Sequence, residues 1–329
     1  NLRITYNDSP IDYNIKYTNA DFSTINQLGA IQIEFSERID VRFLKIAFES
    51  TETAISLDFT NSKITGSAKN MFKDCSWVTA LPIADHSEIT DTEGMYQGTG
   101  LTGSVSISDM SNSKSAKNMF SGCSGNITSL SIANAQNVES VEGMIDGIST
   151  LQTIYLKGFT NDKAKFTDGF LLSNKDSLTS VTLQGNLSEV TTLRSLIMDD
   201  TGKDTKYWEN GRKNEILTYL ELDNTAPNGI TNISSLQSVF QGWSSLNNVT
   251  LKNFKNDTGI SMFATFMSDT SLQSVTIENC KISSANQMFR DCSELSSLAT
   301  TVDMTEVTSV QSMFQNCPIS ASALQTMLL

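Results

Sequence analysis

The feature that most constrains the fold is an internal repeat of about 25 residues. A pair of apolar residues, most often Met followed by an aromatic residue, recurs with most steps between 24 and 27 residues and one long step of 43. Such a period is typical of repeat arrays, in which each unit packs only on its neighbours. The pairs are Met71-Phe72, Met95-Tyr96, Met119-Phe120, Met144-Ile145, Phe170-Leu171, Leu196-Ile197, Val239-Phe240, Phe266-Met267, Met288-Phe289 and Met313-Phe314.

Between these pairs lies a second motif, apolar-x-x-apolar-x-apolar. Its last two apolar positions alternate with polar residues, which is the pattern of a short strand with one buried face. Each repeat therefore supplies one strand. The clearest copies are Val78/Leu81/Ile83, Ile127/Leu130/Ile132, Leu151/Ile154/Leu156, Leu178/Val181/Leu183, Leu217/Leu220/Leu222, Leu246/Val249/Leu251 and Leu272/Val275/Ile277.

A turn rich in Asn, Gly, Ser and Asp follows each strand, and then comes a segment such as 115–120 whose apolar pair must point inward. We interpret this segment as a short helix or a 3₁₀ turn. One strand and one such turn in about 25 residues fall within the range of leucine-rich repeats. The sequence thus predicts an α/β repeat: a right-handed leucine-rich-repeat-type solenoid with a parallel β-sheet on one face and short helices or 3₁₀ turns on the other.

The two ends of the chain differ from the repeats. Residues 1–50 lack the apolar pair but alternate like strands near 11–17 and 31–35, so we expect a β-rich N-terminal cap or a small flanking domain. Residues 51–329 are predicted to form the solenoid, with about ten repeats and a long insertion near 199–215. The apolar end around Leu324, Met327 and Leu328 indicates either a packed terminal cap or a following domain.

Charge and hydropathy exclude some partners. A formal charge of −13 repels nucleic-acid phosphates, and no cluster of Lys or Arg acts against that field. No apolar stretch approaches the roughly 18–20 residues that span a bilayer. Because the chain begins at Asn1, we expect any signal peptide or lipid or wall anchor to lie outside it.

The single histidine argues against most familiar enzymes. His86 follows the Leu81/Ile83 strand in a turn with Asp85, and we expect it to be an exposed polar residue. A catalytic triad, a His-supported cysteine nucleophile or a His-rich metal site would each need it. A glycosidase needs only two acidic residues, but none of the 36 stands out. We therefore predict no enzyme activity, no metal site and no cofactor.

Four of the five cysteines stand four residues after the first residue of an apolar pair: Cys75, Cys123, Cys292 and Cys317. The chain has no Cys-x-x-Cys pair, and these residues are spread along the array, so we expect them to be small buried apolar residues. A disulfide between Cys292 and Cys317 is the alternative, because they belong to adjacent repeats. Cys280 is expected to be an unpaired thiol, tolerated if buried.

Polar residues between the buried strand positions should form the outer surface of the sheet, where repeat arrays commonly bind. Tyr155, Tyr219 and Glu221 are its chemically distinctive members and suit a sugar or a peptide. The alternative is that Ser and Thr occur there because they fit strands. The two rows are Ser106, Ser131, Tyr155, Thr182, Glu221, Thr250 and Thr276, and Ser104, Ser129, Thr153, Ser180, Tyr219, Asn248 and Ser274.

The insertion is the second candidate binding site, because solenoid insertions emerge as loops on one face. Tyr207 and Trp208 lie among polar residues there and suit a ligand contact. The alternative is a surface excursion whose Trp packs back onto the array. Asp199, Asp200 and Asp204 offer oxygen ligands for Ca²⁺, yet their spacing matches no EF-hand loop.

The repeated motif resembles the BspA-like leucine-rich repeat family over roughly residues 50–320. The segments that carry the likeness are Lys69-Asn70-Met71-Phe72-Lys73-Asp74-Cys75, Lys117-Asn118-Met119-Phe120-Ser121-Gly122-Cys123, Met288-Phe289-Arg290-Asp291-Cys292 and Met313-Phe314-Gln315-Asn316-Cys317. The resemblance implies a microbial surface protein, often anchored to wall or lipid and linked with adhesion, without catalytic residues. The middle copies depart from the motif, with Trp243 at a cysteine position.

Together these features predict a secreted or cell-surface binding module, associated with an outer membrane or a cell wall. It would act as an adhesin or a surface ligand-capture protein for a protein, peptide or glycan, through the strand face or the 199–213 loop. The alternative is a structural spacer or a subunit of a larger cell-surface assembly. A hydrolase is disfavoured.

Overall fold

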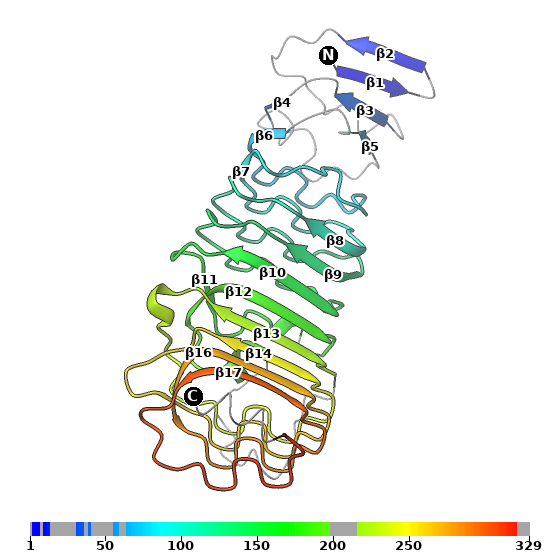
Figure 1. The fold of residues 1–329 in the computed structure, drawn as a ribbon. Coiled ribbons are helices and arrows are strands. Elements are labelled where there is room, and N and C mark those ends of the chain that lie inside the picture. The colour runs from blue at the N-terminus through cyan, green and yellow to red at the C-terminus, as the bar shows by residue number, and fades with distance from the viewer. Residues whose placement is uncertain are drawn as a thin grey trace. The chain divides into compact units, whose positions relative to one another are not determined.

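The computed structural model describes residues 2–6, 9–13, 31–35, 39–40, 55–58, 64–174, 176–197 and 216–320. The chain divides into two compact units: unit 1 comprises Asn1–Leu151 and Leu156–Ala164, and unit 2 comprises Gln152–Tyr155 and Lys165–Leu329. Figure 1 labels the strands along the chain. Each unit contains stacked turns of a parallel β-solenoid, as the sequence predicts, with about nine turns in the part of the chain that the structure describes. The predicted domain boundary near residue 50 stays a prediction.

Unit 1 contains two small sheets and the first turns of the array. The order of the four-stranded sheet is β2-β1-β3-β5, and that of the three-stranded sheet is β4-β6-β7. Strands β8 and β9 pair in parallel, with Val105 opposite Leu130. The strands are β1 (Leu2–Tyr6), β2 (Ser9–Tyr13), β3 (Ile31–Phe35), β4 (Ile39–Asp40), β5 (Ile55–Asp58), β6 (Ile64–Ser67), β7 (Ile89–Asp91), β8 (Gly103–Ile107) and β9 (Ile127–Ile132).

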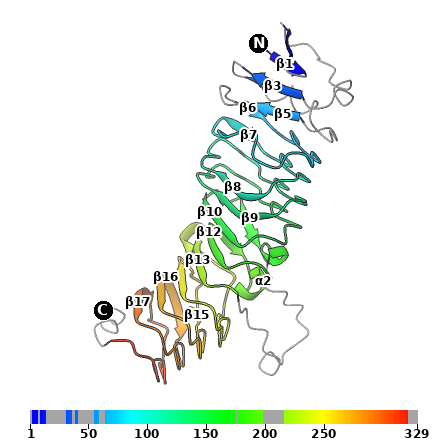
Figure 2. The ribbon, with the colours of Figure 1, turned by 90° about the vertical axis from the view of Figure 1, so that its right-hand side faces the viewer.

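Unit 2 contains a longer parallel sheet, in which β12, β13, β14, β16 and β17 pair in succession (Figure 1). Figure 2 shows β12, β13, β16 and β17 from another side. The first residues of β10 belong to this unit, beside β12. Two short strands, β11 and β15, pair with the far ends of β12 and β16. The strands are β10 (Thr153–Phe159), β11 (Lys165–Thr167), β12 (Ser180–Glu189), β13 (Tyr219–Asn224), β14 (Asn248–Lys252), β15 (Ile260–Ser261), β16 (Ser274–Ser284) and β17 (Ser297–Asp303).

The strand motif places its apolar residues in the core. Leu220 and Leu222 of β13 are fully buried, and the register sets Leu220 opposite Val249 of β14. Because successive side chains on a strand point to opposite faces, the polar residues between them point outward. Identical alternation in neighbouring strands therefore gives one apolar and one polar sheet face.

The wall opposite the strands is built from turns, so of the two predicted possibilities, short helices or 3₁₀ turns, the helices are not supported. We call the eight-residue segments that carry the apolar pairs the turn wall: 68–75, 92–99, 116–123 and 141–148 in unit 1, and 236–243, 262–269, 285–292 and 310–317 in unit 2. Each forms a run of turns. The helices among the described residues are α2 (Leu193–Ile197), η3 (Leu172–Asn174) and η4 (Pro227–Gly229), none longer than five residues.

Left-handed residues explain the absence of helix in the turn wall. Asn118 (φ 53°) and Gly122 (φ 64°) flank Met119 and Phe120, and a residue of this conformation ends a right-handed helix. The backbone N–H groups of Asn118 and Phe120 donate instead to carbonyl groups of the next coil, both at 2.9 Å. Hydrogen bonds between coils thus alternate with turn bonds within the coil, such as Met119 N–H to the Ala116 carbonyl at 3.1 Å, in place of the continuous ladder of a helix.

Aromatic rings stack in a column along the turn wall of each unit. In unit 1 the rings of Phe72, Tyr96 and Phe120 follow one another with centroid distances of 5.7 and 5.6 Å. In unit 2 the column comprises Phe240, Phe266, Phe289 and Phe314, with distances of 5.3 to 5.4 Å. These distances suit favourable ring pairs.

One predicted apolar pair has the wrong register. Phe266 occupies the aromatic column, so its coil contributes Thr265 and Phe266 rather than Phe266 and Met267. Thr265 is fully buried, whereas Met267 is partly exposed. The sequence offered two adjacent apolar residues at this place, and hydropathy alone favoured the wrong pair.

The cysteines behave largely as small buried residues. Cys75, Cys123 and Cys292 are buried and Cys317 is partly exposed, and all four are free thiols, so Cys292 and Cys317 are not bonded. Cys280 is also a buried free thiol. Burial raises the pKa of Cys280 to about 11, which keeps the thiol protonated and unreactive at neutral pH.

His86 is buried, which corrects the prediction of an exposed turn residue. Its side chain is 2% exposed, and Nε2 lies 2.9 Å from the hydroxyl of Tyr96. Burial lowers the pKa of His86 to about 4, although Asp85 acts in the opposite direction. The imidazole is therefore neutral at physiological pH and contributes to the core around the first aromatic column.

Candidate functional site

The outward residues of unit 2 form three rows across the parallel sheet, which we call the strand face. Strict register keeps residues of the same row opposite one another in neighbouring strands. Tyr155 joins them on β10, where it is exposed between buried neighbours. The rows are Ser180, Tyr219, Asn248, Ser274 and Ser297; Thr182, Glu221, Thr250, Thr276 and Ala299; and Gln184, Asp223, Lys252, Glu278 and Thr301.

The structure brings three predicted site residues into unit 2. Tyr155 is 40% exposed, which is unusual for a large aromatic side chain. Tyr219 and Glu221 stand two residues apart on β13, and the Tyr219 hydroxyl donates a hydrogen bond of 3.0 Å to Oε2 of Glu221. Burial raises the pKa of Tyr219, and the carboxylate of Glu221 adds to the effect. The other two, Tyr207 and Trp208, lie outside the described residues, as do Asp199, Asp200 and Asp204.

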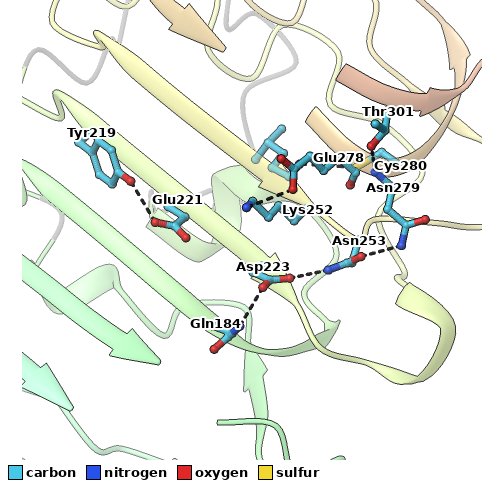
Figure 3. A network of polar contacts seen from close by, with 11 residues as sticks. Gln184, Tyr219, Glu221, Asp223, Lys252, Asn253, Glu278, Asn279, Cys280 and Thr301 are labelled. Atoms are coloured by element: carbon cyan, nitrogen blue, oxygen red, sulfur yellow. Dashed lines mark hydrogen bonds and ion pairs between the residues drawn. The ribbon is translucent and has the colours of Figure 1, made fainter. Parts of the chain in front are cut away.

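A chain of amide and carboxylate groups crosses the sheet at the ends of the strands (Figure 3). Gln184 donates to Oδ2 of Asp223 at 2.9 Å, and Asn253 donates to Oδ1 of the same carboxylate at 2.6 Å. Asn279 in turn donates to Oδ1 of Asn253 at 2.6 Å. We call these four residues the amide ladder. Because each link joins residues of neighbouring coils, the ladder fixes the position of the Asp223 carboxylate.

A lysine lies among the carboxylates of the strand face. The ammonium group of Lys252 contacts Oε2 of Glu278 at 3.1 Å. The hydrogen bond to Glu278 raises the pKa of Lys252, and the charges of Glu278, Glu221 and Asp223 add to the increase. The face therefore holds three carboxylates and one ammonium group in proximity, which leaves an excess of two negative charges.

Sequence reasoning missed the third row of the strand face. It followed the apolar motif and stopped at the last buried position of each strand. The signal was the same period of two, continued by one step to Asp223, Lys252 and Glu278. Two members of the amide ladder, Asn253 and Asn279, gave no comparable signal in the sequence. Their φ values are positive, 63° and 52°, so they do not follow the strict alternation of a strand.

The described residues offer little for metal or membrane chemistry. No group of three or more His, Cys, Asp or Glu side chains in the described ranges is arranged to hold a metal ion. The helices that the structure describes are all too short or too polar to cross a bilayer. The strand face itself presents hydroxyl, amide, carboxylate and phenol groups, which suit recognition by hydrogen bonds and charge.

Comparison with known proteins agrees with the repeat architecture. A family model described as "Mycoplasma protein of unknown function, DUF285" matches residues 59–175 and 218–327, and supports the resemblance to BspA-like repeats. No curated protein matches the chain.

Two solved structures are similar at low identity. A leucine-rich repeat protein from Bacteroides ovatus is 15% identical, with 96% of this chain and 71% of that chain covered and a TM-score of 0.32. A leucine-rich repeat protein from Eubacterium ventriosum is also 15% identical, with 88% and 84% covered and a TM-score of 0.25. Neither description names a ligand.

Proposed function

The chain belongs to the DUF285 family of repeat proteins, and from that premise we propose that it is a surface-exposed binding module that recognises its ligand through the strand face of unit 2. The module serves as an adhesin or as a ligand-capture protein, and it is not an enzyme. Its location is extracellular or at the cell surface, in keeping with the usual location of BspA-like repeats.

The observation that carries this proposal is the combination of exposure and order on the strand face. Tyr155 offers an exposed ring, while Tyr219, Glu221 and Asp223 are held by hydrogen bonds within the folded protein. A ligand that binds such a face does not have to order these side chains, so less conformational entropy is lost on binding. Proteins, peptides and glycans all present the complementary hydrogen-bonding groups.

A direct binding screen tests the proposal. The intact chain is screened by thermal shift and surface plasmon resonance against glycans and extracellular matrix proteins, and each hit is repeated with a Tyr155→Ala/Tyr219→Ala variant. We expect the double variant to weaken binding at least tenfold, because aromatic residues dominate binding energy at such surfaces. Ser104→Ala/Ser129→Ala, on the strands of unit 1, is the matched control and should leave binding unchanged.

Other outcomes separate the alternatives. If binding survives the tyrosine substitutions but is lost on Tyr207→Ala/Trp208→Ala, the ligand site belongs to the insertion and the strand-face proposal is wrong. If a folded chain binds nothing in the screen, the spacer or assembly-subunit hypothesis replaces recognition.

A further inference from the structure

We propose that the strand face of unit 2 binds a cationic, extended peptide segment, with Lys or Arg side chains received beside Tyr219, Glu221 and Glu278. The inference rests on the proposed function, which requires only that this face binds a ligand. It adds the chemistry of the ligand and commits to a peptide rather than a glycan.

Charge complementarity is the first support. Glu221 and Asp223 stand on β13 and Glu278 on β16, with β14 between them, and Lys252 of β14 alone among the paired outward residues of these rows carries a positive charge. Within the three rows the remaining outward residues are neutral, and Lys157 follows Tyr155 by two residues on the neighbouring β10. An exposed, ordered face of this sign attracts cations and disfavours anionic ligands such as phosphates and sulfated sugars.

The face already binds one ammonium group, which belongs to its own chain. Lys252 contacts Glu278 at 3.1 Å, and the charges of Glu221 and Asp223 also raise its pKa. The side chain of Lys252 is 31% exposed and that of Glu278 is 44% exposed, so the Glu278 carboxylate remains open to solvent. Lys252 therefore shows in the folded protein the interaction that a lysine from a partner would make.

Aromatic rings provide the second component of a cation site. Tyr155 is 40% exposed on β10, and the hydroxyl of Tyr219 on β13 donates a hydrogen bond to Glu221. A ring face attracts ammonium and guanidinium groups, and a carboxylate beside it adds a direct ion pair. The outward rows repeat at the strand spacing of about 4.8 Å, so one extended segment crossing the strands meets several of these groups.

Titration with hexalysine tests the inference, with hexaglutamate and a neutral glycan, chitohexaose, as comparison ligands. We expect the intact chain to bind hexalysine alone, with affinity that falls as salt concentration rises. Glu221→Gln/Glu278→Gln should weaken binding by about tenfold, because two carboxylate contacts lose their charge. Lys252→Gln should strengthen binding about threefold, because it removes the competing ammonium group.

The matched control is Glu139→Gln/Glu142→Gln in unit 1, which changes the net charge equally. Glu142 pairs with Lys117 at 2.7 Å and Glu139 with Lys163 at 3.2 Å, so these residues resemble Glu278 in being paired with lysine. We expect less than about a twofold effect from this control. Thermal midpoints of all variants verify that each is folded.

Three results would overturn the inference. If Glu221→Gln/Glu278→Gln and Glu139→Gln/Glu142→Gln weaken hexalysine binding equally, the overall acidity of the chain explains the binding. If Lys252→Gln binds hexalysine more weakly than the intact chain, the face prefers an anion. If chitohexaose binds and the Tyr155→Ala/Tyr219→Ala variant abolishes it while hexalysine does not bind, the peptide inference fails and the strand-face function stands.

Discussion

At the scale of single residues, the last position of a turn-wall segment is Thr99 in the coil 92–99 of unit 1 and Asp269 in the coil 262–269 of unit 2. The Thr99 hydroxyl donates to the carbonyl of Tyr96 at 2.8 Å, and the Cys123 thiol of the next coil donates to the same carbonyl at 3.2 Å. In unit 2, the Cys292 thiol donates likewise to the carbonyl of Phe266 at 3.0 Å. Asp269 is fully buried there, and burial raises its pKa to about 8.

Asp269 makes the stability of unit 2 depend on pH. The folded-state pKa of about 8 exceeds the unfolded value of 3.8, so the folded state binds the extra proton between these limits. The contribution of Asp269 to the free energy of unfolding is therefore fully present below about pH 4 and is lost as pH rises through 8. Asp269→Thr, which recreates the arrangement around Thr99, should stabilise the chain by about 2 kcal/mol at pH 8.5 and by little at pH 4.

Urea unfolding of the intact chain and of the Asp269→Thr variant between pH 4 and pH 9 measures the difference in their free energies of unfolding. His86 acts in the opposite sense, because its pKa is lowered from 6.5 to about 4, so its contribution is lost as pH falls through that range. Both proteins retain His86, so its effect cancels in the comparison. If the difference in the free energy of unfolding between the two proteins stays constant with pH, Asp269 does not titrate in the folded state over this range.

At the scale of elements, the turn wall depends on residues that tolerate a positive φ. The two such residues of each coil stand four apart, as Asn118 and Gly122 do, and the intervening apolar pair points inward. The same place is held by Asp74 and Asn316 in other coils, and Asn and Asp adopt this conformation more readily than other residues with a Cβ. A close approach of coils imposes a separate requirement at Gly125, where a Cβ would meet the carbonyl oxygens of Gly100 and Leu101.

Two glycines of one coil should respond differently to substitution. Gly122→Ala is expected to destabilise the chain by about 1 kcal/mol, because the position has φ 64° but open space around an added Cβ. Gly125→Ala should cost about 3 kcal/mol, because the backbone of the preceding coil must move. Gly122→Asn serves as the control and should cost less than Gly122→Ala. Urea midpoints measure all three, and equal costs for the two alanine variants would contradict this account of the wall.

At the scale of the whole molecule, the sequence predicted the features that repeat and missed those that depend on backbone conformation. Buried strand residues such as Leu220 and the outward position of Tyr219 follow from a period of two, which is visible in any copy. The turn wall was predicted as a short helix or a 3₁₀ turn because Met119-Phe120 fits either structure, and the φ of Asn118 excludes a continuous helix. The burial of His86 depends on a contact with Tyr96, ten residues further along the chain, for which one sequence gives no signal.

Nearest-neighbour packing predicts that damage to one coil stays local. Phe266 stacks on Phe240 at 5.3 Å and on Phe289 at 5.4 Å, and it is fully buried, so Phe266→Ala should destabilise these coils by about 4 kcal/mol. Each coil of a repeat array contacts only its neighbours, so the loss should spread little along the chain. Amide hydrogen exchange read by mass spectrometry should accelerate in the turn wall of unit 2 and remain unchanged around Tyr96 and Phe120 of unit 1.

The reciprocal variant makes the test symmetrical. Tyr96 stacks on Phe72 and Phe120 at 5.7 and 5.6 Å, so Tyr96→Ala should accelerate exchange in unit 1 alone. Acceleration of both units by either variant would show that the array unfolds as one cooperative body, and nearest-neighbour packing would then be an insufficient description. Local effects from both variants would mean that the strand face of unit 2 keeps its geometry when distant coils open, because the order of that face comes from hydrogen bonds within its own strands.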